Sequence, residues 1–345
     1  MVGREGGGER RLEGAEVRAG GRVALVAAFG AVWFIWGSTY LAIAWAVEGI
    51  PPLLMIGVRC LLAGTVLYAW GAARGSVRPS PADWGDAARA GILMFVTGQA
   101  VLAWAETRVP SGAASLLIAT EPLFITLLAW RQASSRGVIG GAPRPAQALA
   151  LLVGLVGVAV LVLPGVGGAG LDLVGAGAAV AASFSWSMGV VRGSGRPGIP
   201  AGQTAGMQLL AASAVLLVLA VGAGDLGALP PGGPSPRALA AFAYLVVLGS
   251  VVTFGAYVWL LGRVGPARLS THAYVNPLVA VALGAVLNGE AVTAGLVGGA
   301  TLILGSVVVL LRAPAHAPPE VVADAVAADV RLTVPEARLP EAVTG

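Results

Sequence analysis

Ten long apolar segments, each about twenty residues and nearly free of charge, most constrain the fold of this chain. A segment of that length crosses the hydrocarbon core of a bilayer as an α-helix. Transmembrane strands are disfavoured, because strands alternate apolar and polar residues over about ten positions and these runs are continuous. The expected spans, with ends good to a few residues, are 23–46, 52–71, 88–106, 112–131, 146–164, 171–191, 203–223, 238–261, 268–287 and 292–312.

The composition agrees with a polytopic membrane protein. Charged residues are 11% of the chain, against about 25% in a soluble domain. All 21 basic residues are arginine, and with 51 glycines this indicates a GC-rich, bacterial genome. The net charge of +4 does not indicate a nucleic-acid partner, because the arginines lie in loops between spans, where topology explains them. Cys60 is the only cysteine, so no internal disulfide is possible, and its place in a span indicates a packing residue.

The distribution of arginine predicts the orientation in the membrane. With the amino terminus inside, the inner segments hold 16 arginines and the outer loops hold only Arg108 and Arg237. Arg59 lies within a span, and Arg331 and Arg338 lie in the distal tail, so they are not counted. Because cytoplasmic loops are enriched in arginine, both termini are expected in the cytoplasm of an inner-membrane protein. No cleavable signal peptide is expected in the polar first 22 residues.

One half of the chain echoes the other at a spacing of 155 residues. Trp104, Arg108, Val109, Pro122 and Leu123 recur as Trp259, Arg263, Val264, Pro277 and Leu278. Because each copy holds five spans, an odd number, the second copy is inverted. The prediction is an all-α polytopic membrane protein with ten transmembrane helices as two inverted five-helix repeats. Such repeats place a substrate site at their interface near mid-membrane. The expected parts are a cytoplasmic tail (1–22), the first repeat (23–164), the second repeat (171–312) and a disordered cytoplasmic tail (313–345).

Three ionisable residues, Arg59, Glu121 and His272, lie within spans. A charge in mid-membrane costs a few kcal/mol, so it requires a partner or a cavity. Arg59 and Glu121 either form a buried salt bridge that fixes helix packing or act directly on a substrate or a proton. A role of Arg59 in topology or folding alone is a further alternative. Glu121 is a candidate proton-coupling carboxylate.

Polar side chains precede two prolines at equivalent positions of the repeat, in Glu121-Pro122 and Asn276-Pro277. A proline inside a transmembrane helix frees a backbone carbonyl and permits a kink. Symmetry-related kinks flanked by polar side chains suit a central cavity, although both prolines are also explained by helix shape alone.

Aromatic residues are the remaining candidates for a cavity wall. Trp45, Trp70, Trp104 and Trp130 lie near span ends, as interfacial tryptophans do. The deeper aromatics are equally well explained by core packing or by a cavity lining. The candidate lining residues are Trp36, Tyr40, Trp186, Tyr257 and Tyr274, together with Gln99 in the third span.

Soluble catalytic motifs are absent or out of context. Two G-x-G-x-x-G matches, at 165–170 and 193–198, do not lie between a strand and a helix, so they do not indicate dinucleotide binding. His272 and His316 are the only histidines, so a metal site is not expected. No nucleophile elbow is present. The sequence therefore predicts no catalytic residues, no metal and no cofactor.

The chain resembles the EamA-type permeases of the drug/metabolite transporter superfamily over residues 23 to 312. No single motif is decisive, but their order and spacing are specific. They are Trp36 to Ile43, Pro51-Pro52, Arg59, Ala63-Gly64, Pro110 to Ala114, Glu121 to Leu123, Gly249-Ser250, Ala256-Tyr257, Pro266 to Ser270, Tyr274 to Pro277 and Gly289-Glu290.

The resemblance implies a ten-helix secondary carrier with a central cavity, working without ATP or metal. Such permeases usually export, and sometimes import, amino acids, metabolites or small toxic compounds. It also implies that Arg59, Glu121 and Asn276 are cavity or gate residues. We therefore expect an inner-membrane exporter of small metabolites, amino acids or drug-like compounds, with the lipid bilayer and the substrate as partners. It would work by alternating access about Pro122 and Pro277, with proton coupling as a further hypothesis.

The alternative function is an intramembrane enzyme or sensor without transport activity. An enzyme would need a convergent catalytic set inside the bilayer, and the sequence holds no histidine or cysteine cluster. A sensor would usually carry a larger soluble output domain than the short polar tails of this chain.

Overall fold

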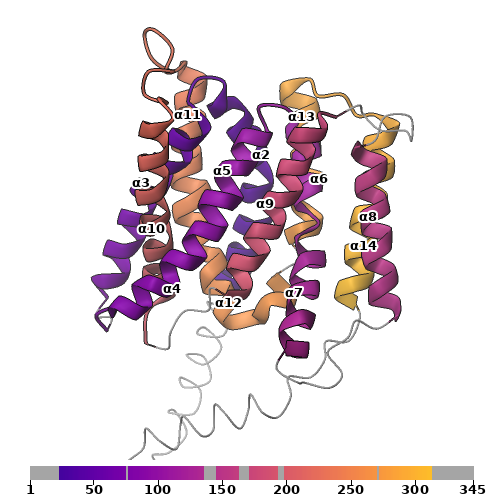
Figure 1. The fold of residues 1–345 in the computed structure, drawn as a ribbon, viewed down its shortest axis with the longest axis horizontal. Helices are drawn as coiled ribbons and strands as arrows, with labels where there is room; N and C mark the ends of the chain where they lie inside the picture. Colours follow the sequence, from indigo (N-terminus) through magenta and orange to yellow (C-terminus); the bar gives the residue numbers. More distant parts are fainter. Residues whose placement is uncertain are drawn as a thin grey trace, which may run out of the picture. The chain divides into compact units, whose positions relative to one another are not determined.

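The computed structural model describes residues 23–74, 77–135, 145–162, 171–192, 198–269 and 272–312, and the regular structure there is helical (Figure 1). The two tails, and the glycine-rich segments predicted at 165–170 and 193–197, lie outside the described residues.

The helices follow the predicted spans in order. In the first repeat they are η1 (Ala31–Ile35, a π-helix), α2 (Trp36–Val47), α3 (Pro52–Ala72), α4 (Pro81–Gly91), η2 (Ile92–Gln99, a π-helix), α5 (Ala100–Ala105), α6 (Ser111–Ile118), α7 (Glu121–Ser135) and α8 (Pro145–Val162). In the second repeat they are α9 (Leu173–Arg192), α10 (Ala201–Gly222), α11 (Pro236–Tyr244), η3 (Leu245–Val252, a π-helix), α12 (Thr253–Leu269), α13 (His272–Asn288) and α14 (Ala294–Arg312).

The predicted number of spans agrees with the structure. Seven stretches of helix are long and apolar enough to cross a membrane, and three shorter apolar helices, Pro145–Leu161, Val275–Asn288 and Ala294–Val309, occupy the other predicted spans of the described residues. The helix of the eighth span is longer than predicted, because α12 continues to Leu269 rather than ending at 261. The third span begins at Pro81 rather than at 88. Ser80 and Asp83 form a capping box there, so the polar turn before the apolar run is also helical.

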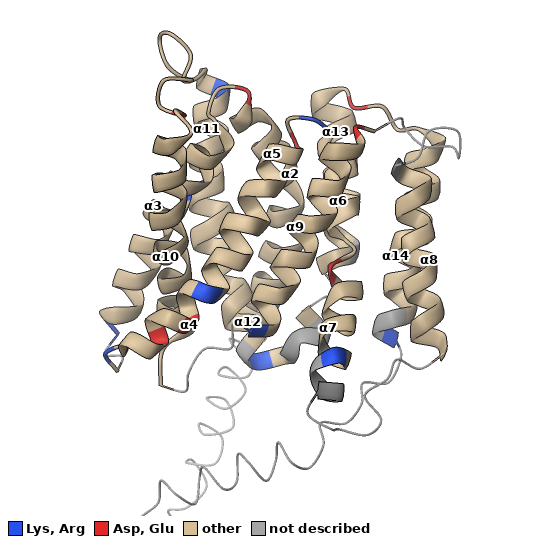
Figure 2. Ribbon diagram, viewed as in Figure 1, with Lys and Arg blue, Asp and Glu red and all other residues tan. Residues whose placement is uncertain are grey.

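The second repeat is inverted relative to the first. Arg108 and Arg263 are equivalent in sequence, and each lies over the tryptophan one turn before it, at 4.7 Å from Trp104 and 4.0 Å from Trp259. α5 and α12 nevertheless end at opposite ends of the helical bundle (Figures 1 and 2). We call the end with the loops 48–51, 106–110, 223–235 and 289–293 the Arg108 face, and the opposite end the Arg263 face.

Polar contacts join the two repeats across the Arg108 face. The Glu290 carboxylate accepts hydrogen bonds from the N–H groups of Ser111 (3.1 Å) and Gly112 (3.0 Å) at the start of α6. A carboxylate at a helix N-terminus satisfies free donors and complements the helix dipole. Further contacts between repeats on this face are Glu48 with Arg237, Trp45 with Asn288, the Leu54 N–H with Asp225, and Arg108 with Asp172. These contacts connect the two repeats at the Arg108 face.

The Asp172 contact predicts a pH dependence of stability. Asp172 precedes α9, and hydrogen bonds from the Arg108 side chain and from the backbone of Gly175 and Val174 lower the pKa of its carboxyl. A carboxyl with a lowered folded-state pKa stabilises the protein above its unfolded pKa of about 3.9 and loses that contribution as pH falls through the folded pKa. We expect Asp172→Asn to lower the melting temperature slightly at neutral pH, with a difference from wild type that shrinks below about pH 3.9. Thermal unfolding in detergent across pH checks this, and a constant difference would contradict it.

Close helix contacts in the bundle depend on glycine. A Cβ added at Gly206 of α10 would lie 2.4 Å from the backbone nitrogen of Tyr68 in α3, and one at Gly91 would lie 2.2 Å from the Gln208 carbonyl oxygen. Small residues drive helix association in lipid because they permit such close backbone approach.

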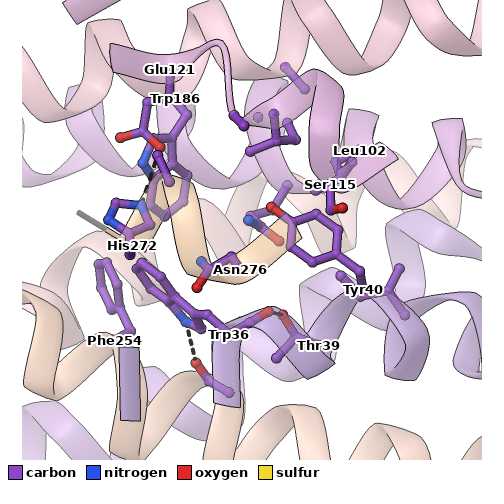
Figure 3. A pocket seen from close by; sticks show the side chains of 18 of the residues that line it. Trp36, Thr39, Tyr40, Leu102, Ser115, Glu121, Trp186, Phe254, His272 and Asn276 are labelled. Carbon is purple, nitrogen blue, oxygen red and sulfur yellow. Dashed lines mark hydrogen bonds and ion pairs between the residues drawn. The ribbon is translucent and has the colours of Figure 1, made fainter. Parts of the chain in front are cut away.

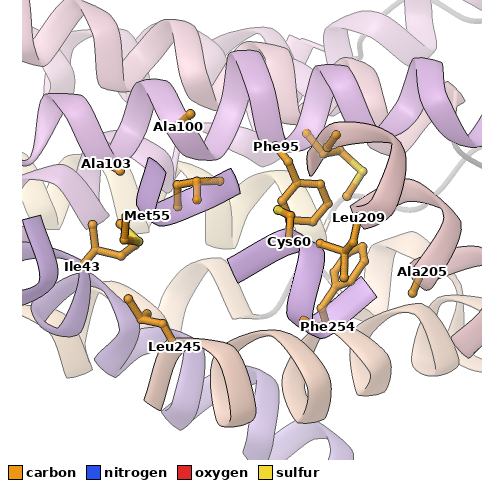
Figure 4. Close-up of a cluster of buried hydrophobic side chains, with 14 of the residues drawn as sticks. Ile43, Met55, Cys60, Phe95, Ala100, Ala103, Ala205, Leu209, Leu245 and Phe254 are labelled. Carbon is orange, nitrogen blue, oxygen red and sulfur yellow. The ribbon is translucent and has the colours of Figure 1, made fainter. Parts of the chain in front are cut away.

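Apolar side chains from both repeats form the core beside these contacts (Figure 4). Met55, Cys60 and Phe95 of the first repeat meet Leu209 and Phe254 of the second. Cys60 is 1% exposed, as expected for a packing residue.

Candidate functional site

A cavity lies between the repeats, at the level where helices from both halves meet (Figure 3). Its wall combines aromatic rings with polar side chains, as ligand sites commonly do. The lining residues include Trp36, Thr39, Tyr40, Arg59, Phe95, Gln99, Ser115, Glu121, Trp186, Ser250, Phe254, His272, Asn276 and Pro277.

Glu121 and His272 form a buried pair on this wall. The Glu121 Oε2 lies 3.6 Å from the His272 Nε2, and the two residues are 4% and 6% exposed. The other ring nitrogen of His272, Nδ1, lies 2.9 Å from the Leu269 carbonyl oxygen, which fixes the ring orientation. Glu121 belongs to the first repeat and His272 to the second, so the pair connects the two halves at the cavity.

The fourth span is interrupted at Glu121, and this corrects the expected kink at Pro122. α6 ends at Ile118 and α7 begins at Glu121, with a turn at Ala119 and Thr120 between them. Pro122 is therefore the second residue of a new helix, where a missing N–H leaves no bond unmade. Pro277 lies inside α13, as predicted. Broken transmembrane helices occur where backbone lines a cavity, and Ala119 and Glu121 both line this one.

Two of the π-helices occupy equivalent positions of the repeats and border the cavity. η2 covers Ile92–Gln99 and η3 covers Leu245–Val252, and a shift of 155 residues nearly superimposes them. η2 contributes Phe95, Gly98 and Gln99 to the wall, and η3 contributes Gly249 and Ser250. π-helical turns are rare in proteins overall, and those that occur are often found at functional sites. Sequence reasoning missed them, because a continuous apolar run has the same appearance in α- and π-helix.

Arg59 reaches the cavity without pairing with Glu121. Its Nε donates a 2.6 Å hydrogen bond to the Ser250 Oγ in η3, and the residue is 6% exposed. The expected alternative of an Arg59–Glu121 salt bridge is therefore wrong for this structure, since the Glu121 carboxylate faces His272.

Trp36 is the centre of an aromatic cluster at the cavity. Its ring lies 4.9 Å from Tyr257, 5.9 Å from Trp186 and 5.7 Å from His272, between ring centroids. Its Nε1 donates to the Gly249 carbonyl oxygen at 3.0 Å. Trp36 and Trp186 line the cavity, whereas the Tyr257 side chain, 3% exposed, packs in the hydrophobic core beside them.

The remaining predicted lining residues are Tyr40, Gln99, Asn276 and Tyr274. Tyr40, Gln99 and Asn276 line the cavity. The Asn276 amide nitrogen can reach the carbonyl oxygens of Val32 (3.0 Å) and Trp33 (2.8 Å) in η1. The side chain of Tyr274 lies outside the described part of the structure.

Sequence reasoning did not select every wall residue. His272 was recognised as an ionisable residue within a span but not as the partner of Glu121. Residues not selected from the sequence include Thr39, Phe95, Ser115, Ser250 and Phe254. Apart from the charge of His272, none carried a signal, because serine, threonine and phenylalanine are ordinary residues of packed transmembrane helices.

Comparisons with known proteins agree with this architecture. The sequence matches the EamA-like transporter family twice, over residues 23–163 and 173–312. It is 38% identical over 269 residues to the uncharacterized inner membrane transporter YedA of Escherichia coli K12, covering 77% of this chain and 83% of that protein. It is 25% identical to a probable amino-acid metabolite efflux pump of Salmonella typhimurium, covering 78% and 89%.

A solved crystal structure shares the fold, with a TM-score of 0.58 at 23% identity over 84% of this chain and 97% of the other. The family match covers both repeats, and the chain spans most of the length of these relatives. The chain therefore belongs to the EamA-like transporter family and is a multi-pass inner-membrane transporter.

Proposed function

We propose that the cavity between the repeats is the transport site for small amphipathic metabolites, which the protein exports by alternating access. The observation that carries the proposal is the position of the cavity, whose wall draws Trp36, Arg59 and Glu121 from the first repeat and Ser250 and His272 from the second. A rocking motion of one repeat against the other changes the side of the membrane from which such a site is accessible, while each repeat keeps its own fold.

The contacts between the repeats on the Arg108 face support alternating access. The arginine distribution predicts that this face is outside and that both termini lie in the cytoplasm. Contacts such as Glu290 with the start of α6, and Arg108 with Asp172, must then break for the cavity to open outward. Because they are hydrogen bonds and ion pairs on a loop face, water can replace them at modest cost.

The wall suggests a substrate with an apolar body and a polar group. Trp36, Phe95, Trp186 and Phe254 offer ring surface, whereas Thr39, Gln99 and Ser115 offer hydrogen-bonding groups. Export rather than import follows the similarity to a probable amino-acid metabolite efflux pump.

Proton coupling is the second part of the proposal. Glu121 and His272 are the cavity's acid–base pair, and they lie on different repeats. Adding or removing a proton there changes the attraction between the repeats, so occupancy by a proton can bias the position of one repeat against the other. The Glu121 side chain is buried at the first residue of α7.

Transport by purified protein in liposomes tests the proposal. We expect saturable flux of at least one labelled amino acid or amphipathic drug, and we expect a pH gradient to accelerate it. The flux should be lower in Trp186→Ala, because this variant removes an aromatic ring from the cavity wall. Trp70→Ala, at an exposed tryptophan away from the cavity, is the matched control. Absence of saturable flux across the panel, together with hydrolytic activity, would instead favour an intramembrane enzyme.

A further inference from the structure

Arg59 carries a buried charge whose hydrogen-bonding capacity is only partly used. The Nε is held by Ser250, but the Nη1, also buried, has no hydrogen-bond partner in the part of the chain that the structure describes. An unpaired buried donor on a charged group costs more than one on a neutral group. The guanidinium lines the cavity, so a ligand there can reach it.

None of the described carboxylates forms an ion pair or a hydrogen bond with Arg59. Glu121 faces His272, and Glu290 binds the start of α6. Glu106 is within electrostatic reach of Arg59, yet neither of its oxygens hydrogen bonds to a described residue. No ion pair of Arg59 is therefore found among the described residues.

Gly249 makes room for the guanidinium. A Cβ at this position would lie 3.3 Å from the Arg59 Nη2 and 3.1 Å from the Thr39 Cγ2. Gly249 also belongs to η3, and its carbonyl oxygen accepts the Trp36 indole N–H. The guanidinium is thus hydrogen bonded through its Nε to the Ser250 hydroxyl and lies close to Gly249, while its buried Nη1 has no hydrogen-bond partner among the described residues.

We propose that Arg59 is an anion subsite that binds the carboxylate of the transported compound, with the apolar body of that compound against Trp36 and Trp186. The proposal rests on the function proposed above and names the group that the cavity selects. A guanidinium fixed through its Nε presents its remaining N–H groups in a plane that suits a carboxylate. A carboxylate bound there would accept a hydrogen bond from the Nη1, which has no partner among the described residues.

Matched pairs of ligands test the subsite directly. The probes are 3-phenylpropionate with 3-phenylpropionamide, and phenylalanine with phenylalaninamide, because each pair differs at the carboxylate alone. We expect wild-type protein to bind each carboxylate at least tenfold more tightly than its amide. That preference should fall below threefold in Arg59→Gln and be partly restored in Arg59→Lys. Affinity is measured by isothermal calorimetry on the full chain in detergent.

Two further variants keep the test decisive if Arg59→Gln does not fold. Ser250→Ala frees the Nε and should lower carboxylate affinity several-fold without changing amide affinity. Arg89→Gln, at an exposed arginine of α4 that does not line the cavity, should leave the preference unchanged.

The outcomes separate the two proposals. Equal binding of carboxylate and amide by the wild type, or a preference that survives in both Arg59→Gln and Ser250→Ala, overturns the subsite while leaving the cavity as a binding site. Failure of the wild type to bind any member of the pairs, with no saturable flux in liposomes, overturns both.

Discussion

Glu121→Gln is expected to abolish the acceleration of transport by a pH gradient. Glutamine keeps the size of the side chain and leaves a polar group opposite His272, whose Nε2 lies 3.6 Å from the Glu121 Oε2, but glutamine does not titrate. If the Glu121–His272 pair carries the coupled proton, flux driven by a pH gradient falls at least tenfold, which corresponds to about 1.4 kcal/mol or more of lost coupling. Flux down a substrate gradient persists, because the cavity keeps its shape.

The measurement compares the flux of one labelled substrate in liposomes with and without an imposed pH gradient. Asp86→Asn is the matched control, since this aspartate pairs with Arg89 on the exposed side of α4 and does not line the cavity. An unchanged response of Glu121→Gln to the gradient would show that the coupled proton does not bind at this pair. Equal loss in Asp86→Asn would indicate a general effect of charge on the protein.

Gly206→Ala is expected to destabilise the fold although it adds only one methyl group. The new Cβ would lie 2.4 Å from the Tyr68 nitrogen and 2.7 Å from the Tyr68 Cα, and backbone atoms cannot turn away as a side chain can. α3 and α10 must therefore separate. Overpacking of this kind costs about 1–3 kcal/mol, with the loss of neighbouring helix contacts in addition.

Gly177→Ala is the control for this prediction. Gly177 also lies inside a helix, α9, but no atom lies within 4 Å of a Cβ built there. Alanine should leave stability unchanged or raise it by up to about 1 kcal/mol, because glycine is the poorer helix former. Thermal unfolding of both variants in one detergent measures the difference. Similar melting temperatures for the two variants would mean that the α3–α10 contact relaxes more easily than the distances indicate.

The architecture was predictable from the sequence because the bilayer restricts what a chain can do. Backbone groups in lipid must be paired within a helix, so each apolar run of about twenty residues has one solution. Trp104 and Arg108 recur as Trp259 and Arg263 five spans later. Because five is an odd number of membrane crossings, the second copy must be inverted relative to the first. The membrane orientation stays a prediction from the arginine count.

The candidate site was only partly predictable. Charge in an apolar span singled out Arg59, Glu121 and His272, because it needs a physical reason. Their pairing was not predictable, since it depends on how helices far apart in sequence rotate against each other. An Arg59–Glu121 pair was one of the alternatives, whereas the structure pairs Glu121 with His272 and Arg59 with Ser250.

Periodicity and charge in the sequence alone determined the ten helices, the repeat and the short list of polar residues inside the bundle. Only the tertiary structure decided where the helices are irregular: the break before Glu121, and the π-turns of η2 and η3 that turn Gln99 and Ser250 to the cavity wall. The physical reason is that an α-helix, a π-turn and a broken helix differ by one or two backbone hydrogen bonds. Which of the three forms depends on the backbone carbonyl groups that neighbouring helices, prolines and polar side chains can satisfy. A run of apolar residues in the sequence does not reveal these tertiary contacts.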